Sequence, residues 1–339
     1  MNNQQFQEFG DLEITERSAQ LLLELDAYVA LNFDQLIADF VDCLTTYCQK
    51  IVKMQATGEK KAISFLNFSL LQTNLLRQKY ELRIDAYDET WYLDRVACVG
   101  SYEVGKFYQG LTTFWQELVA THKKYLGKLK YSQLQSLFFE ESYKYLIFVQ
   151  ELMRVAIKKA VESNIYQQVK RNDVFVICLG GYQDGVDVVY KEDRTIKNAK
   201  AVRRHLTAKN GQEARFSYEF CDHLDLSAGN FTRVSTAFSS FTGCDFTDAS
   251  FEASAHVMTN FELATFKNTN FKNTKLFDLN FSGATLENLD FTGSRLKHLN
   301  FQGATLKNVN FEQALLISQL DFTGATLINT QIPKERSGH

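Results

Sequence analysis

The sequence predicts an α + β protein whose two parts are separate domains: an all-α N-terminal domain, followed by a C-terminal domain of stacked β coils. Apolar residues follow a helical rhythm in the first half, and one recurs at every fifth position in the last third. The chain has 339 residues with 28 Phe and a single Pro, which suits stacked coils because they need backbone N–H donors. We expect a helical domain at 1–172, a junction at 173–213, coils at 214–333 and a tail at 334–339.

The helical domain is predicted from apolar residues spaced three and four apart. The clearest segment follows Asn32, where Phe33, Leu36, Ile37 and Phe40 keep this spacing. We expect further helices at 15–31, 63–76, 101–124 and 132–169, the last as one long helix or two. Residues 80–88 alternate between polar and apolar like a strand.

The junction is predicted to contain a hairpin and a basic helix. Residues 173–179 and 186–193 read as two strands around a glycine-containing turn, and such a hairpin can cap the open end of a stack of coils. The basic helix that follows offers a candidate phosphate-binding patch, although such a run is usually a solvated helix face. No aromatic residue is interleaved to stack on bases, so we do not expect a nucleic-acid partner. The patch consists of Lys197, Lys200, Arg203 and Arg204.

The five-residue period begins at Leu226 and holds to Leu316, then resumes after a one-residue slip at Phe322. Five matches neither the helical period of 3.6 nor the strand period of 2. It is satisfied if each pentad forms one side of a coil and then turns a corner. Glycines such as Gly283 and Gly303 follow the central residue by two places, where a tight turn needs them.

Stretches such as Ala284-Thr285-Leu286-Glu287-Asn288 resemble the pentapeptide-repeat family, whose pattern is a small residue, a polar residue, Leu or Phe, and two more polar residues. The resemblance covers about a third of the chain and implies a right-handed quadrilateral β-helix with four pentads per coil. Sorting the sequence in steps of twenty supports this arrangement, because two opposite sides then become pure phenylalanine columns. These columns are Phe231, Phe251, Phe271, Phe291 and Phe311, and Phe241, Phe261, Phe281, Phe301 and Phe322.

One outer side of the predicted coils carries an apolar patch where the other sides are polar. Lys275, Arg295 and Lys297 interrupt it. Such a patch is typical of an interface, and it could be covered by the chain's own helical domain, by a second copy or by another protein. The patch consists of Phe238, Val257, Met258, Phe277, Leu315 and Ile317.

Chemistry-bearing motifs are absent from the sequence. It contains no G-x-S-x-G, H-E-x-x-H or C-x-x-C pattern, so we expect no catalytic residues, no cofactor and no enzyme activity. Cys221 and His223 lack a second pair at zinc-site spacing, so no metal site is expected, and His256 at an inward position reads as a hydrogen-bonded core histidine. The six cysteines read as reduced thiols. No apolar run reaches the length of a membrane span, and we expect a cytoplasmic bacterial protein.

Three functions fit these observations. The first is a non-enzymatic interaction or scaffold protein that binds a protein partner or forms a homodimer. The second comes from the resemblance, because some pentapeptide-repeat proteins mimic DNA and bind type II topoisomerases, which protects against drugs or toxins. It ranks second because a DNA mimic needs a continuous negative stripe, whereas residues 215–332 carry 12 acids and 8 bases, and the acids at Asp245 and Asp248 give way to Lys267 and Lys307. An enzyme with its site in the helical domain ranks third.

Overall fold

Most of the predicted helices form in the computed structural model, which describes residues 15–124, 130–182, 186–206, 215–318 and 320–332. Helix α3 buries Phe40 and Leu44 as its periodicity requires. The run 132–169 is two helices: the first ends at Ala160, and Ser163 caps the second by accepting a hydrogen bond from Tyr166 N. The helices of this part are α2 (Thr15–Leu31), α3 (Phe33–Ala56), α5 (Gln109–Lys124), α6 (Tyr131–Ala160) and α7 (Asn164–Gln168).

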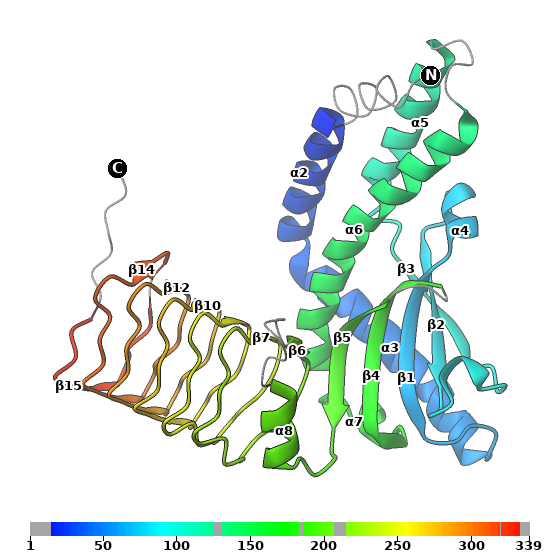
Figure 1. The fold of residues 1–339 in the computed structure, drawn as a ribbon. Helices are drawn as coiled ribbons and strands as arrows, with labels where there is room; N and C mark the ends of the chain where they lie inside the picture. Colours follow the sequence, from blue (N-terminus) through cyan, green and yellow to red (C-terminus); the bar gives the residue numbers. More distant parts are fainter. Residues whose placement is uncertain (1–14, 125–129, 183–185, 207–214, 319, 333–339) are drawn as a thin grey trace. The chain divides into compact units, whose positions relative to one another are not determined.

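The expectation of an all-α N-terminal domain is wrong, because these helices pack with a five-stranded sheet (Figure 1). The strand order is β3-β2-β1-β4-β5. β1 pairs with β2 antiparallel and with β4 parallel. The strands are β1 (Ile63–Leu70), β2 (Glu81–Tyr87), β3 (Val99–Glu103), β4 (Arg171–Gly181) and β5 (Val186–Asp193).

The helix expected over 63–76 is mostly strand β1, and this strand is buried on both faces. Leu66 and Phe68 belong to the core shared with the helices, whereas Phe65 on the other face stacks on Trp91 of the short 3₁₀ helix η2 (Trp91–Leu93), with ring centroids 4.2 Å apart. Because the adjacent residues Phe65 and Leu66 are both apolar, the alternation seen from Leu66 to Leu70 does not extend through the whole strand. Only α4 (Gln72–Leu76) is helical in the range 63–76.

The other strands correct two more expectations. The segment 80–88 forms β2, as predicted. The helix expected over 101–124 begins only at Gln109, because its first residues belong to β3. The two strands expected at the junction are β4 and β5 of this sheet, so the first compact unit extends to Glu192, beyond the expected boundary at 172.

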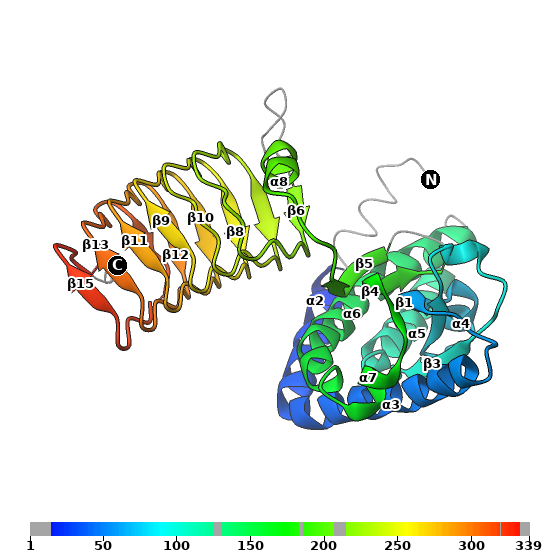
Figure 2. The same ribbon diagram turned by 90° about the horizontal axis from the view of Figure 1, so that it is seen from below.

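The second unit is a β-solenoid of about six turns, as the five-residue period predicts. Strands one coil apart pair in parallel and in register, so that Lys275 lies beside Arg295. Figure 2 shows the strands stacked along two walls; the right-handed sense stays a prediction. One wall is a six-stranded sheet of β6 (Arg215–Ser217), β7 (Ser235–Ala237), β8 (Ala255–Val257), β10 (Lys275–Phe277), β12 (Arg295–Lys297) and β14 (Leu315–Leu316). The other comprises β9 (Thr265–Lys267), β11 (Thr285–Glu287), β13 (Thr305–Lys307) and β15 (Thr326–Ile328).

The predicted phenylalanine columns fill the solenoid. The Phe291 ring stacks between those of Phe271 and Phe311, with centroids 5.1 and 5.0 Å away, and Phe281 stacks on Phe301 at 5.2 Å. The corner two places after each central residue from Phe216 to Phe311 has a positive φ, as in Gly283 at +63°. The core therefore depends on one left-handed residue per pentad.

Helix α8 (Ala199–Leu206) covers the first coil of the solenoid. Val202 and Leu206 are buried in the same core as Phe216 of β6, and the His205 ring lies 5.5 Å from that of Phe216. The basic helix expected at the junction is thus the cap of the coils. The expected tail, 334–339, lies outside the described residues.

Candidate functional site

All six residues of the predicted apolar patch lie on or beside the six-stranded wall. The central residue of each strand points into the core, so its neighbours, such as Val257 and Phe277, point outward. Met258 is 48% exposed, and Leu315 and Ile317 are each 42% exposed. Phe238, Val257 and Phe277 are half-buried. One coil, that of Arg295 and Lys297, separates Leu315 and Ile317 from the rest of the patch.

Two patch residues occupy strained corners. Phe238 and Met258 have φ values of +53° and +46°, and bulky side chains rarely adopt this left-handed region. Most later corners instead have Gly, Asn or Asp, such as Asn268 and Asn288. The Phe238 ring stacks on that of Tyr218 one coil earlier, with centroids 4.9 Å apart. This corner column therefore places large apolar groups where the backbone favours small polar ones.

The charges of the two walls differ. On the six-stranded wall, Lys275 and Arg295 are direct neighbours on adjacent strands, and both are exposed. On the other wall, Lys307 Nζ lies 2.7 Å from Glu287 Oε1 on the neighbouring strand. That hydrogen bond and the charge of Lys307 hold the pKa of Glu287 below its usual value. Neighbouring charges therefore have opposite signs on the four-stranded wall and the same sign on the six-stranded wall.

The four basic residues of the expected phosphate patch do not form one site. Lys197 Nζ binds Asp193 Oδ2 at 2.5 Å. Burial alone would raise the pKa of Asp193, but hydrogen bonds from Lys197 and Thr195 lower it to about 2. Arg203 donates to the carbonyl oxygens of Asp225 and Ser227 at 2.8 and 3.1 Å, which ties α8 to the solenoid. Only Lys200 and Arg204 remain fully exposed.

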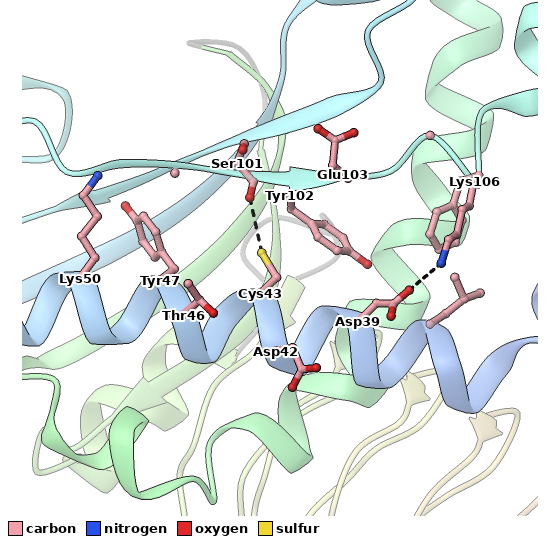
Figure 3. Close-up of a pocket in the computed structure, with 14 residues that line it drawn as sticks. Asp39, Asp42, Cys43, Thr46, Tyr47, Lys50, Ser101, Tyr102, Glu103 and Lys106 are labelled. Atoms are coloured by element: carbon pink, nitrogen blue, oxygen red, sulfur yellow. Dashed lines mark hydrogen bonds and ion pairs between the residues drawn. The ribbon is translucent and has the colours of Figure 1, made fainter.

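A groove that sequence reasoning missed lies in the first unit, between α3 and the edge strand β3, with a volume of about 710 Å³ (Figure 3). Cys98 O accepts from Ala86 N of β2, so the carbonyls of Val99 and Ser101 point away from β2. Val99 O accepts from Lys50 Nζ at 2.6 Å, and Ser101 O from Cys43 Sγ at 3.5 Å. Side chains of α3 therefore occupy the acceptors by which another strand would pair.

The polar groups of this groove are engaged with the protein itself. Asp39 binds Lys106 at 2.8 Å, and this bond keeps the pKa of Asp39 low. Burial raises the pKa of the Cys43 thiol to about 11, so this thiol is protonated at neutral pH and is a weak nucleophile. A Cβ on Gly100 would lie 2.5 Å from the Tyr47 ring, so that glycine permits the close approach of α3.

The five-residue repeat is matched by the family model for pentapeptide repeats (8 copies), at residues 244–278 and 275–313. The C-terminal region is a pentapeptide-repeat domain. The residues that the family model matches all lie within the β-solenoid.

Solved structures similar to this chain are themselves pentapeptide-repeat proteins. Rfr23 from the cyanobacterium Cyanothece 51142 is 20% identical, with a TM-score of 0.17, over 34% of this chain and 86% of that one. QnrB1, a plasmid-mediated fluoroquinolone resistance protein, is 13% identical, with a TM-score of 0.20, over 34% and 84%. HetL from the cyanobacterium Nostoc sp. strain PCC 7120, involved in heterocyst differentiation regulation, is 13% identical, with a TM-score of 0.12, over 40% and 94%. The chain matches no curated protein.

The buried histidine and the two buried cysteines of the pentapeptide-repeat domain are structural. His256 is fully buried, and its Nδ1 and Nε2 lie 2.7 Å from Thr236 Oγ1 and 2.8 Å from Ser254 Oγ. Burial lowers the pKa of His256 to about 3, so the ring is neutral, as expected of a core histidine. Cys244 Sγ donates to the Cys221 carbonyl. Within the described residues, no cluster of three or more His, Cys, Asp and Glu is arranged to hold a metal ion.

None of the helices in the described ranges has both the length and the apolar composition needed to cross a bilayer.

Proposed function

We propose that the protein is a non-enzymatic interaction protein that binds a partner protein through the six-stranded wall of its pentapeptide-repeat domain. The observation that carries this proposal is the placement of Phe238 and Met258 in left-handed corners. Each such residue costs the free protein about 1–2 kcal/mol relative to glycine. Burying an exposed apolar side chain in an interface recovers about 1.5–3 kcal/mol.

The other wall supports this assignment by contrast. Its outward column is Thr265, Thr285, Thr305 and Thr326, and its second column contains the paired Glu287 and Lys307. A solenoid of the same sequence pattern therefore builds a wall suited to water on one side and an apolar wall on the other. The two walls differ in their outward residues, which do not contribute to the core and are free to serve binding.

The topoisomerase alternative ranks second because the solenoid surface has amide columns in place of an acidic stripe. Asn268, Asn288 and Asn308 are joined by side-chain hydrogen bonds of 2.9 Å each. Acids that do occur are partly neutralised, as where Lys272 Nζ lies 3.1 Å from Asp290 Oδ2. DNA presents a continuous line of negative charge, and these columns do not.

We therefore predict little effect of the purified protein on a type II topoisomerase. In a supercoiling assay with gyrase and excess protein, neither inhibition nor protection from a quinolone is expected. Clear activity at sub-micromolar protein would move the topoisomerase function into first place.

The wall is tested with the double variant Phe277→Glu and Met258→Glu, which adds two charges to the apolar patch. Its matched control is Thr285→Glu and Thr305→Glu, at outward positions of the other wall. Light scattering measures self-association, hydrogen exchange measures protection of the rest of the chain, and affinity purification from the native host compares bound proteins. A partner lost by the patch variant and kept by the control supports the proposal. If the patch variant matches the wild type in all three measurements, the proposal is wrong.

A further inference from the structure

We infer that the partner presents a cluster of carboxylates flanked by apolar side chains, and this inference rests on the interface proposed above. The wall carries three cations, Lys275, Arg295 and Lys297, between its two apolar regions. Lys275 and Arg295 face the same direction on adjacent strands, about 4.8 Å apart. Like charges directly opposite each other in a sheet destabilise it.

No carboxylate of the wall offsets these charges. The outward positions of its described strands from β7 to β12 are Ser, Ala, Val, Phe, Lys and Arg. Within the described ranges, Lys275, Arg295 and Lys297 take part in no ion pair. The nearest corner acid, Asp278, binds His298 Nδ1 at 2.9 Å.

Outside the six-stranded wall, two lysines of the solenoid form ion pairs with acids one coil away. Lys272 reaches Asp290 at 3.1 Å, and Lys307 reaches Glu287 at 2.7 Å. The fold therefore accommodates cross-coil ion pairs wherever the sequence supplies an acid. On the apolar wall the acid is missing, so a partner's carboxylates would fill the place that Glu287 fills on the other wall.

The arrangement also defines the shape of the complementary surface. Lys275 and Arg295 are one coil apart, and Arg295 and Lys297 are two residues apart along β12, so the cations span about 5 by 7 Å. Val257 and Met258 lie in the coil before these cations, and Leu315 and Ile317 in the coil after them. Phe277 lies among the cations, on the strand of Lys275 and beside Lys297. Two or three carboxylates between two apolar groups match this order.

An anionic membrane surface offers related chemistry, but the charge on the wall favours a protein. Segments that bind acidic lipids through charge carry about four to eight clustered Lys and Arg, whereas this wall has three cations held on short strands. A small cluster in a rigid frame suits a partner with carboxylates in fixed positions.

The experiment uses the full chain as bait for a random dodecapeptide display library. The charge variant is Lys275→Glu with Arg295→Glu. Its matched control is Lys267→Glu with Lys307→Glu, which changes the net charge equally on the other wall. Peptides selected on the wild type and on the control are expected to be enriched in Asp and Glu beside apolar residues. The charge variant is expected to lose that enrichment and to bind the selected peptides at least tenfold more weakly.

Three outcomes overturn the inference. They are a selected set without acidic enrichment, equal binding of acidic peptides by the charge variant, and co-sedimentation with phosphatidylserine vesicles in the absence of selected acidic peptides. The charge variant could bind as the wild type does while Phe277→Glu with Met258→Glu loses binding. That result would support the proposed interface and refute the inference that the partner is acidic. If neither variant changes binding, both the interface and the inference fail.

Discussion

At the residue scale, the buried imidazole of His256 gives the solenoid a defined sensitivity to acid. Its folded pKa is about 3, below the ordinary 6.5, so the unfolded chain binds a proton between these pH values and the folded chain does not. Stability is therefore present above pH 6.5 and falls on acidification, by about 1.4 kcal/mol per pH unit. Urea denaturation at pH 6.5 and pH 5 is expected to show a loss of about 2 kcal/mol from this group.

The variant His256→Leu isolates that contribution, because leucine is the residue found at the same position in the next two coils, Leu276 and Leu296. We expect it to remove the corresponding part of the pH dependence. The control is His298→Leu, which changes an exposed histidine. An unchanged pH dependence in His256→Leu would show that the neutral ring does not govern acid stability.

A second residue-scale prediction separates stability from function at the strained corners. Met258→Asn places a residue that tolerates positive φ where the backbone already has +46°, and we expect it to raise the free energy of unfolding by about 1 kcal/mol. The same variant is expected to weaken partner binding. Leu263→Asn, at φ +57° on a different corner, should stabilise equally and leave binding unchanged. Equal loss of binding in both variants would contradict a role specific to the wall.

At the element scale, a strand could be predicted from the sequence only where its apolar residues recur at a regular spacing. Every strand of the solenoid follows from the five-residue period, because inward residues repeat in register every twenty positions, as Leu276 and Leu296 do. The candidate patch was predictable for the same reason. Strand β1 has no single period, because the alternation that runs from Leu66 to Leu70 is broken at Phe65, whose ring packs on the opposite face against Trp91.

The groove between α3 and β3 could not be predicted from the sequence. It forms where these two elements lie side by side, and the sequence predicted a helix over part of β3. Lys50 and Cys43 lie on the face of α3 toward β3 (Figure 3). Their sequence spacing indicates a shared helix face but not the strand that lies against it. A glycine at residue 100 was the available signal, since it allows a ring to approach a strand closely.

The cap helix α8 provides an element-scale prediction. Leu206 is buried in the solenoid core beside Phe216, so Leu206→Ala is expected to cost about 2–5 kcal/mol. The loss should appear first as faster hydrogen exchange in β6 and β7, because each repeat contacts only its neighbours and these strands lie next to the cap. Lys200→Ala, exposed on the same helix, is the control. Equal exchange in β6 for both variants would show that α8 does not stabilise the first coil.

At the scale of the whole molecule, the chain has two cores that share no residue. The first includes Phe175 and Ile177 of β4, which pairs with β1 in the middle of the sheet. The second begins with Val202 of α8. The sequence predicted the two parts, but it placed their boundary before β4, because a strand that pairs with a partner a hundred residues earlier leaves no local signal of that partner.

The position of the boundary predicts how fragments behave. A fragment of residues 1–192 retains β4 and is expected to unfold cooperatively, whereas 1–172 lacks β4 and β5 and exposes the edge of β1 that pairs with β4. Residues 193–339 keep α8 with the coils and are expected to fold alone, with the acid sensitivity of His256 intact. Circular dichroism and urea denaturation of the three fragments test this division. Cooperative unfolding of 1–172 with the stability of 1–192 would show that β4 does not complete the first core.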